Sequence, residues 1–149
     1  MIANEREYAA SCRRRRELLA IRDTYLARPQ VDPLAQEWLI ASVESVLAQV
    51  GAEIAEYEAL RSGSVGELTL TGLAELPAAL VRARIAAGLS QRQLAERLDV
   101  AEQAVQRDEA GGYARASLDR LQGVAAALGL EVEGILRLRP RMDTARAGD

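Results

Sequence analysis

The feature that most constrains this chain is a regular apolar seam within residues 33–61. Its members recur at alternating steps of three and four residues: Ile40, Val43, Leu47, Val50, Ile54 and Tyr57. This heptad spacing keeps one face of an α-helix continuously apolar. Asp32 and Pro33 supply an N-cap and a first-turn proline, and Gly63 is a natural stop. The sequence therefore predicts one helix from about Pro33 to Arg61, more than ~40 Å long at about 1.5 Å per residue.

A second helix is predicted before this one. Asn4 and Glu7 have the spacing of a capping box, and neither glycine nor proline interrupts the chain as far as Leu26. Four apolar residues are spaced along one side of it: Tyr8, Leu18, Ile21 and Tyr25. Across the short connection at 27–32, this helix is the natural antiparallel partner of the longer one. Residues 1–62 are therefore expected to form a helical hairpin.

A two-helix hairpin leaves apolar side chains without cover, here Trp38, Leu39 and Val46. A foreign helix or a second copy of the chain can cover such a surface, and a homodimer is the commoner use of a heptad stripe. We therefore expect the hairpin to dimerise.

The composition changes after the hairpin. Residues 63–72 are rich in Ser, Gly and Thr and lose the helical period, so they are expected to form a linker, with Leu68 and Leu70 in a short extended piece. Short helical units follow, each ended by a glycine or a capping residue: 73–87, 90–98, 101–110 and 117–128. The predicted fold is all-α, with the hairpin at 1–62 and a second domain at 73–139.

The C-terminal end is less defined by its pattern. Apolar residues alternate between Leu130 and Leu138, which fits either a strand or a further helix, and an extended segment is favoured. Residues 140–149 are expected to be a disordered tail.

The helices expected at 90–98 and 101–110 are separated by a short break around Leu98-Asp99-Val100, which is the pattern of a helix-turn-helix motif. Small or apolar residues are expected to face inward: Leu94, Ala95, Leu98, Val100 and Val105, closed by Leu118, Leu121, Val124 and Leu128. Gln103, Gln106 and Arg107 share the outward face of the second helix, with Glu102 beside them.

This pattern resembles the Cro and lambda-repressor class, the XRE family of regulators. The resemblance spans roughly residues 76–130 and rests on these residues: Leu89-Ser90-Gln91, Leu94-Ala95, Leu98-Asp99-Val100, Val105 and Glu109. It implies a lambda-repressor-like domain that binds double-stranded DNA and regulates transcription, with residues 101–110 in the major groove. Many small members are repressors, and others are antitoxins that neutralise a toxin protein and repress their own operon.

The resemblance also implies roles for individual residues. Gln91 would meet a phosphate, while Glu102, Gln103 and Arg107 would meet base edges. Arg84 would form a structural pair with Glu109. The expected DNA-binding set is completed by Arg92, Ala101 and Gln106. Gln can bond adenine and Arg can bond guanine, each contact discriminating by about 1–3 kcal/mol. Two such domains in a homodimer would recognise a palindromic operator, with half-sites about one helical turn, roughly 34 Å, or a multiple of it apart.

Three residues depart from the family pattern. Asp99 stands where the family often has a turn glycine, Ala101 where it often has a capping Ser or Thr, and Asp108 where it usually has an apolar residue. Between residues 76 and 128, seven arginines face six acidic residues, which leaves a charge of +1. We therefore expect modest, salt-sensitive DNA affinity from each monomer.

Composition argues against several other classes of protein. The chain has one cysteine and no histidine, so the usual zinc and iron sites and an internal disulfide are excluded, and no cofactor is expected. No catalytic constellation is evident, so an enzyme is not expected. The N-terminus is charged and no apolar run approaches the roughly 20 residues that span a bilayer, which predicts a cytoplasmic protein.

Some patterns keep two interpretations. Arg13–Arg16 could be a nucleic-acid patch, but a solvated face, partly paired with acids of the second helix, is favoured because four successive residues point around most of a helix. Cys12 could be a redox sensor, with an inert thiol as the default. The alternative to a DNA-binding regulator is an interaction adaptor, in which the hairpin binds a partner protein and the helix-turn-helix serves only packing.

Overall fold

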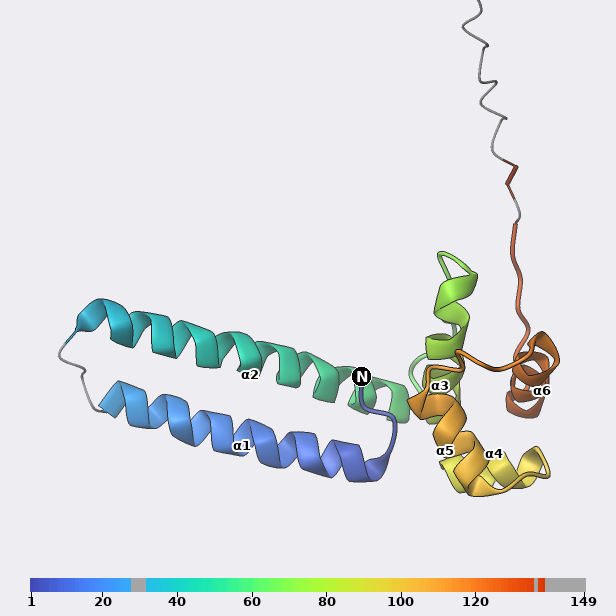
Figure 1. The fold of residues 1–149 in the computed structure, drawn as a ribbon, viewed down its shortest axis with the longest axis horizontal. Coiled ribbons are helices and arrows are strands. Elements are labelled where there is room, and N and C mark those ends of the chain that lie inside the picture. The colour runs from blue at the N-terminus through green and yellow to red at the C-terminus, as the bar shows by residue number, and fades with distance from the viewer. Residues whose placement is uncertain (28–31, 136, 139–149) are drawn as a thin grey trace, which may run out of the picture.

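The computed structural model describes residues 1–27, 32–135 and 137–138, and all regular secondary structure in this part of the chain is helical. The elements are α1 (Glu5–Ala27), α2 (Pro33–Arg61), the short 3-10 helix η1 (Leu73–Glu75), α3 (Leu76–Ala86), α4 (Gln91–Arg97), α5 (Glu102–Ala110) and α6 (Leu118–Leu128). Figure 1 shows α1 and α2 extending together to one side, while α3–α6 cluster at the other end. The prediction of an all-α fold is confirmed.

The hairpin helices begin where their capping residues place them. The backbone N–H of Glu7 donates to Asn4 Oδ1 at 3.0 Å, and the Asn4 amide donates back to Glu7 Oε1 at 2.9 Å. The backbone N–H of Leu34 donates to Asp32 Oδ1 at 3.0 Å. These bonds satisfy N–H groups that have no partner inside a helix.

One continuous hydrophobic core joins the base of the hairpin to the C-terminal helices. The buried residues of the hairpin base are Ile2, Val50, Ile54, Tyr57 and Leu60, and those of the C-terminal helices are Leu80, Val81, Ile85, Leu94, Ala95, Val105, Tyr113 and Val124. The C-terminal half of α2 packs against α3, and the Ile2 side chain is 3% exposed. The hairpin is therefore fixed directly to α3, not only through residues 63–72, which form neither helix nor strand.

The far end of the hairpin is much less covered. α1 has no buried residue, and the buried residues of α2 all lie in its C-terminal half. Ile21, expected to face α2, is exposed, as are Trp38 and Leu39. Each helix of the hairpin covers one face of the other, and the described chain provides no third layer there.

The expected C-terminal strand is not formed in the described residues 130–135 and 137–138. The left-handed Gly129 (φ 68°) ends α6, and the N–H of Leu130 donates back to the carbonyl of Ala125 at 2.9 Å. A strand needs a hydrogen-bonded neighbour, and the described chain offers none. The predicted tail at 140–149 lies outside the described residues.

By length and composition alone, α2 is apolar enough to cross a membrane, with a mean hydropathy of 1.3 over an 18-residue window that is 6% buried. The expectation that no segment approaches this limit is therefore wrong on composition. Two glutamates fall inside that stretch, so the run is not purely apolar, but small apolar residues surround them. Length and composition do not distinguish a helix in lipid from one covered by other protein.

The docking of the hairpin base predicts an unequal cost for two isoleucine substitutions. Ile2→Ala removes a side chain from the shared core and should lower the free energy of unfolding by about 2–5 kcal/mol. The matched control, Ile21→Ala, alters an exposed side chain and should cost much less. Urea denaturation followed by circular dichroism measures both, and equal losses would contradict the shared core.

Candidate nucleic-acid interface

The motif predicted from sequence is built by α4, a tight turn and α5. Ser90 caps α4: its hydroxyl accepts from the N–H of Gln93 at 3.1 Å, and the Gln93 side chain accepts from the N–H of Ser90 at 2.9 Å. The turn then places Asp99 in the left-handed region, at φ 53°. This conformation explains why a glycine is common at this position, and Asp is one of the few other residues that tolerates it.

The inward face of the motif is tightly packed. Leu94, Ala95 and Val105 are buried, and Val124 of α6 closes the same core. Leu98 and Val100 are partly buried against it. The expectation for Leu118 is wrong, because this first residue of α6 is 62% exposed. Ser117 caps α6 just beyond the edge of the core, so the first turn of that helix projects into solvent.

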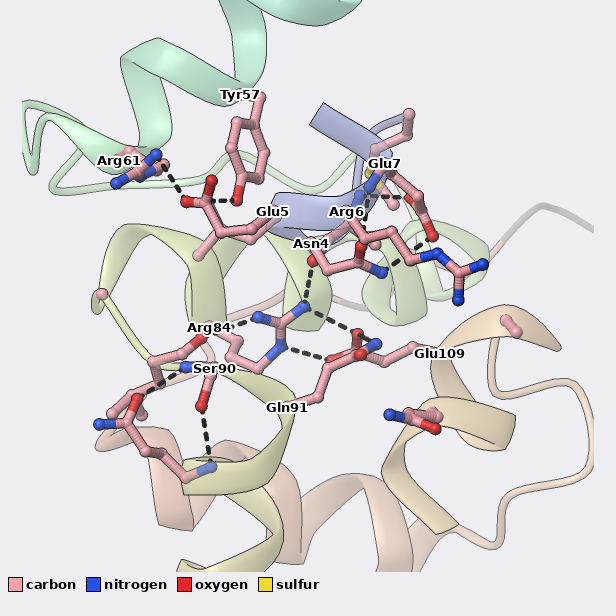
Figure 2. Close-up of a pocket in the computed structure, with 18 of the residues that line it drawn as sticks. Asn4, Glu5, Arg6, Glu7, Tyr57, Arg61, Arg84, Ser90, Gln91 and Glu109 are labelled. Carbon is pink, nitrogen blue, oxygen red and sulfur yellow. Dashed lines mark hydrogen bonds and ion pairs between the residues drawn. The ribbon is translucent and has the colours of Figure 1, made fainter. Parts of the chain in front are cut away.

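A buried ion pair fixes α5 to α3. Arg84 Nε lies 2.6 Å from Glu109 Oε1, and Arg84 Nη2 lies 2.8 Å from Glu109 Oε2, a two-point contact between side chains that are 3% and 1% exposed. Arg84 also donates to the carbonyls of Leu89 at 2.8 Å and Ala3 at 2.6 Å. Figure 2 shows these contacts meeting around the guanidinium.

The contact with Ala3 was not predicted from sequence. It joins residues 81 positions apart, so no local spacing signals it. The only trace in the sequence is Ile2, an apolar residue just before the Asn4 cap. This contact brings the start of the hairpin beside the helix-turn-helix.

The candidate DNA-contacting residues fall into two groups in the structure. Gln103 and Arg107 are exposed on α5, and their side chains make no hydrogen bond or ion pair with the described chain. Gln106 Nε2 donates to Glu102 Oε1 at 2.9 Å, so these two side chains hold one another on the same face. α5 therefore presents a polar, solvent-accessible face opposite its buried one.

The candidate residues of α4 are already engaged. Gln91 Nε2 donates to Glu109 Oε2 at 2.7 Å, which extends the buried pair toward the surface. Arg92 pairs with Glu96 at 3.0 Å, and both are largely exposed. A side-chain amide has two N–H groups, so Gln91 retains one for a further acceptor.

The structure also shows what replaces the family pattern at the other two departures, Ala101 and Asp108. Ala101 precedes α5 without any side-chain cap, as its methyl group requires. Asp108 pairs with Arg120 of α6 at 3.0 Å, so a polar contact replaces the apolar one usual at this position.

An open groove of about 1070 Å³ lies beside α5. One wall is Asn4–Glu7 at the start of α1, and the other includes Ser90, Gln91, Glu102 and Gln106. Figure 2 shows Arg6 and Glu7 on the α1 side of this space, with the Glu7 carboxylate bonded back to Asn4. The groove carries charges of both signs.

The buried pair predicts strongly coupled substitutions. Arg84→Leu or Glu109→Leu alone leaves a buried charge without its partner and should cost about 3–5 kcal/mol of unfolding free energy. The double variant should lose clearly less than the sum, because neither charge remains. Urea denaturation of the four proteins measures the coupling, and additive losses would show that the pair is not an energetic unit.

Tyr113 predicts a loss of stability at alkaline pH. Burial, helped by the nearby carboxylates of Glu109 and Asp108, raises its pKa to about 12. The unfolded pKa is about 10, so the folded state favours the neutral phenol. Its contribution is complete below about pH 10 and is lost as pH rises toward 12. In urea titrations over this range Tyr113→Phe should reduce the loss, and the part that remains comes from Tyr8 and Tyr57, whose pKa values the fold also raises. An unchanged loss in Tyr113→Phe would contradict this assignment.

Comparison with known proteins agrees with this geometry. A family model described as Helix-turn-helix matches residues 80–135, which include α4, the turn, α5 and α6. No curated protein and no solved structure matches the chain. The matched segment holds the buried Arg84–Glu109 pair and the exposed face of α5. Residues 80–135 are therefore a helix-turn-helix domain of the XRE family, and such a domain supports DNA-binding transcription regulation as the general function of the chain.

Proposed function

We propose that this protein is a sequence-specific repressor that places α5 in the major groove of an operator. The observation that carries the proposal is the contrast between the two faces of α5. Val105 and Glu109 are buried and hold the helix in place, whereas Gln103, Gln106 and Arg107 are exposed on the other side. A fixed helix with long polar side chains is what direct reading of base edges needs.

Base contacts are assigned to the outward face of α5. Gln103 suits adenine and Arg107 suits guanine, each through two hydrogen bonds. Gln106 and Glu102 are held together by their own hydrogen bond, so they would reach the bases as a pair. Ala101 is exposed before the first turn of α5, and we assign to it the close approach of the helix backbone to a base.

Phosphate contacts are assigned to α4. Gln91 and Arg92 begin this helix, and the buried Glu109 orients the Gln91 amide. Phosphate contacts fix the position of the protein on DNA without reading sequence. The pairing of Asp108 with Arg120 compensates one negative charge near the expected backbone, while Glu5 and Glu7 keep the neighbouring groove partly acidic. Affinity per monomer should therefore depend strongly on salt.

Recognition of a palindrome requires two copies of the domain. We propose that the hairpin provides the dimer contact, because its far half is uncovered in the single chain. The proposed place of action is the cytoplasm, on DNA. If the protein is in addition an antitoxin, its toxin partner would need a surface other than the face of α5.

The test measures DNA binding by fluorescence anisotropy, using duplexes selected by the protein from a random-sequence library. Gln103→Ala/Arg107→Ala should lose on the order of 10- to 100-fold of its preference for the selected sequence, with weaker effects on unrelated DNA. Arg14→Ala/Gln122→Ala, an equal change on α1 and α6, should keep that preference.

Salt dependence separates the roles of α4 and α5. Arg92→Ala should weaken binding to all sequences alike and reduce the slope of log affinity against log salt by about one. If the protein selects no sequence and its weak binding ignores all of these changes, the repressor proposal fails and the hairpin becomes the candidate site for a protein partner.

A further inference from the structure

α2 carries a second regular face, opposite the seam that packs on α1. Its members recur at alternating steps of four and three residues and include no charged residue: Leu34, Trp38, Ala41, Ser45, Ala48, Ala52 and Ala55. We call these seven residues the outer seam. All of them are exposed. A helix with regular uncharged faces on opposite sides has room for two partner helices along its length, and the described chain provides one, α1, while α3 packs only against the C-terminal half of α2.

We propose that a second copy of this chain covers the outer seam, with the two α2 helices antiparallel. Trp38 is 71% exposed and Leu34 is 61% exposed, which is costly for side chains of this size in water. Burying two tryptophans would remove on the order of 300 Å² from solvent. That is about a quarter of the ~1,200 Å² typical of the smallest stable interfaces, before the rest of the seam is counted.

The order of large and small residues selects the antiparallel direction. The two large side chains lie at the N-terminal end of the seam, and alanines fill its C-terminal end. Antiparallel alignment about Ser45 gives these facing pairs: Leu34 with Ala55, Trp38 with Ala52, Ala41 with Ala48, and Ser45 with Ser45. Each large side chain then meets a small one, which is how packed layers interdigitate. Parallel alignment would set Trp38 against Trp38 and leave the alanine layers unfilled.

The charges beside the seam favour protein over lipid as its cover. Glu37 and Glu44 lie on α2 next to the seam, and 10 of the 23 residues of α1 are charged. Placing these groups in a bilayer is expensive, whereas a helix pair leaves them at its wet margins. Glu44 approaches its own copy near the axis of the proposed dimer, where solvent screens the repulsion.

The dimer geometry constrains the operator, a consequence that rests on the proposed DNA binding. Arg61 lies about 16 residues from Ser45, or about 25 Å along the helix, so the two C-terminal ends of α2 lie about 50 Å apart. Because the hairpin base shares a core with α3 and the helix-turn-helix lies beyond the C-terminal end of α2 (Figure 1), the two DNA-binding domains stand more than about 50 Å apart. Half-sites one turn apart, about 34 Å, would not match, and we expect a spacing of two turns, about 20–21 base pairs.

Disulfide cross-linking without DNA tests the direction of pairing. In a Cys12→Ser background, Ala41→Cys and Ala48→Cys are made as separate proteins. Antiparallel pairing brings position 41 of one copy against position 48 of the other, so the mixture should oxidise to a covalent dimer much faster than either protein alone. Faster self-linking of each single variant would show parallel pairing and overturn the proposal.

Sedimentation equilibrium and the fluorescence of the sole tryptophan, Trp38, test the surface itself. Dilution of the native protein should produce monomers and shift the Trp38 emission to the red. Ala48→Glu buries a charge at the interface and should weaken association on the order of a hundredfold or more. Ala20→Glu, the same change at an exposed position of α1, should leave association unchanged, and circular dichroism should show both variants to be helical.

The outcomes separate this inference from the proposed function. A native protein that stays monomeric at high concentration, or that inserts Trp38 into phosphatidylcholine–phosphatidylglycerol vesicles, overturns the dimer even if it binds DNA. A cross-linked antiparallel dimer that selects no DNA sequence leaves the dimer standing and removes the proposed repressor. Selected operators with half-sites one turn apart would contradict the antiparallel arrangement.

Discussion

The buried guanidinium of Arg84 is the contact on which the rest of the arrangement depends. It is bound at once by Glu109 of α5, by the carbonyl before α4 and by the carbonyl of Ala3. A charge this deeply buried is tolerated only when its hydrogen-bonding groups are satisfied. Moving any of these segments away from Arg84 would therefore cost much of the free energy of unfolding. One side chain thereby fixes α5, the start of α4 and the start of the hairpin in a single geometry.

This geometry links the two halves of the chain. α5 is held from its buried side, which leaves its polar side free to face DNA, and Gln91 extends the same network to the surface. The hairpin enters through Ile2 and the base of α2, so its direction relative to α5 follows from packing and not from the length of the connecting segment. In the proposed dimer, the orientation of the hairpin contact is therefore transmitted to α5 with little freedom between them.

The positions of the helix ends were predictable from the sequence because they depend on local spacing. The helix ends follow from Asn4, Asp32 and Ser90, whose side chains cap the next few backbone N–H groups whatever lies elsewhere. What failed depends on distant contacts. Leu118 has the right spacing for the core, but α6 begins before it reaches the other helices. The approach of Ala3 to Arg84 has no periodic signature, because it joins the two ends of the fold.

The heptad pattern in α2 correctly predicted the hairpin, but it describes only one face of the helix. The seam through Val50 and Ile54 accounts for the hairpin, and the neighbouring Trp38 signals uncovered surface, but neither fixes a partner or a direction. The opposite face of α2 indicates a direction, because its large side chains lie at one end and its small ones at the other. Two copies of this face are complementary only when the helices run antiparallel. A helix long enough to present two such faces then determines how far apart two DNA-binding domains stand, because its length sets their separation and the shared core prevents them from swinging inward. The spacing of the operator would in that case be encoded in the hairpin and not in the helix-turn-helix.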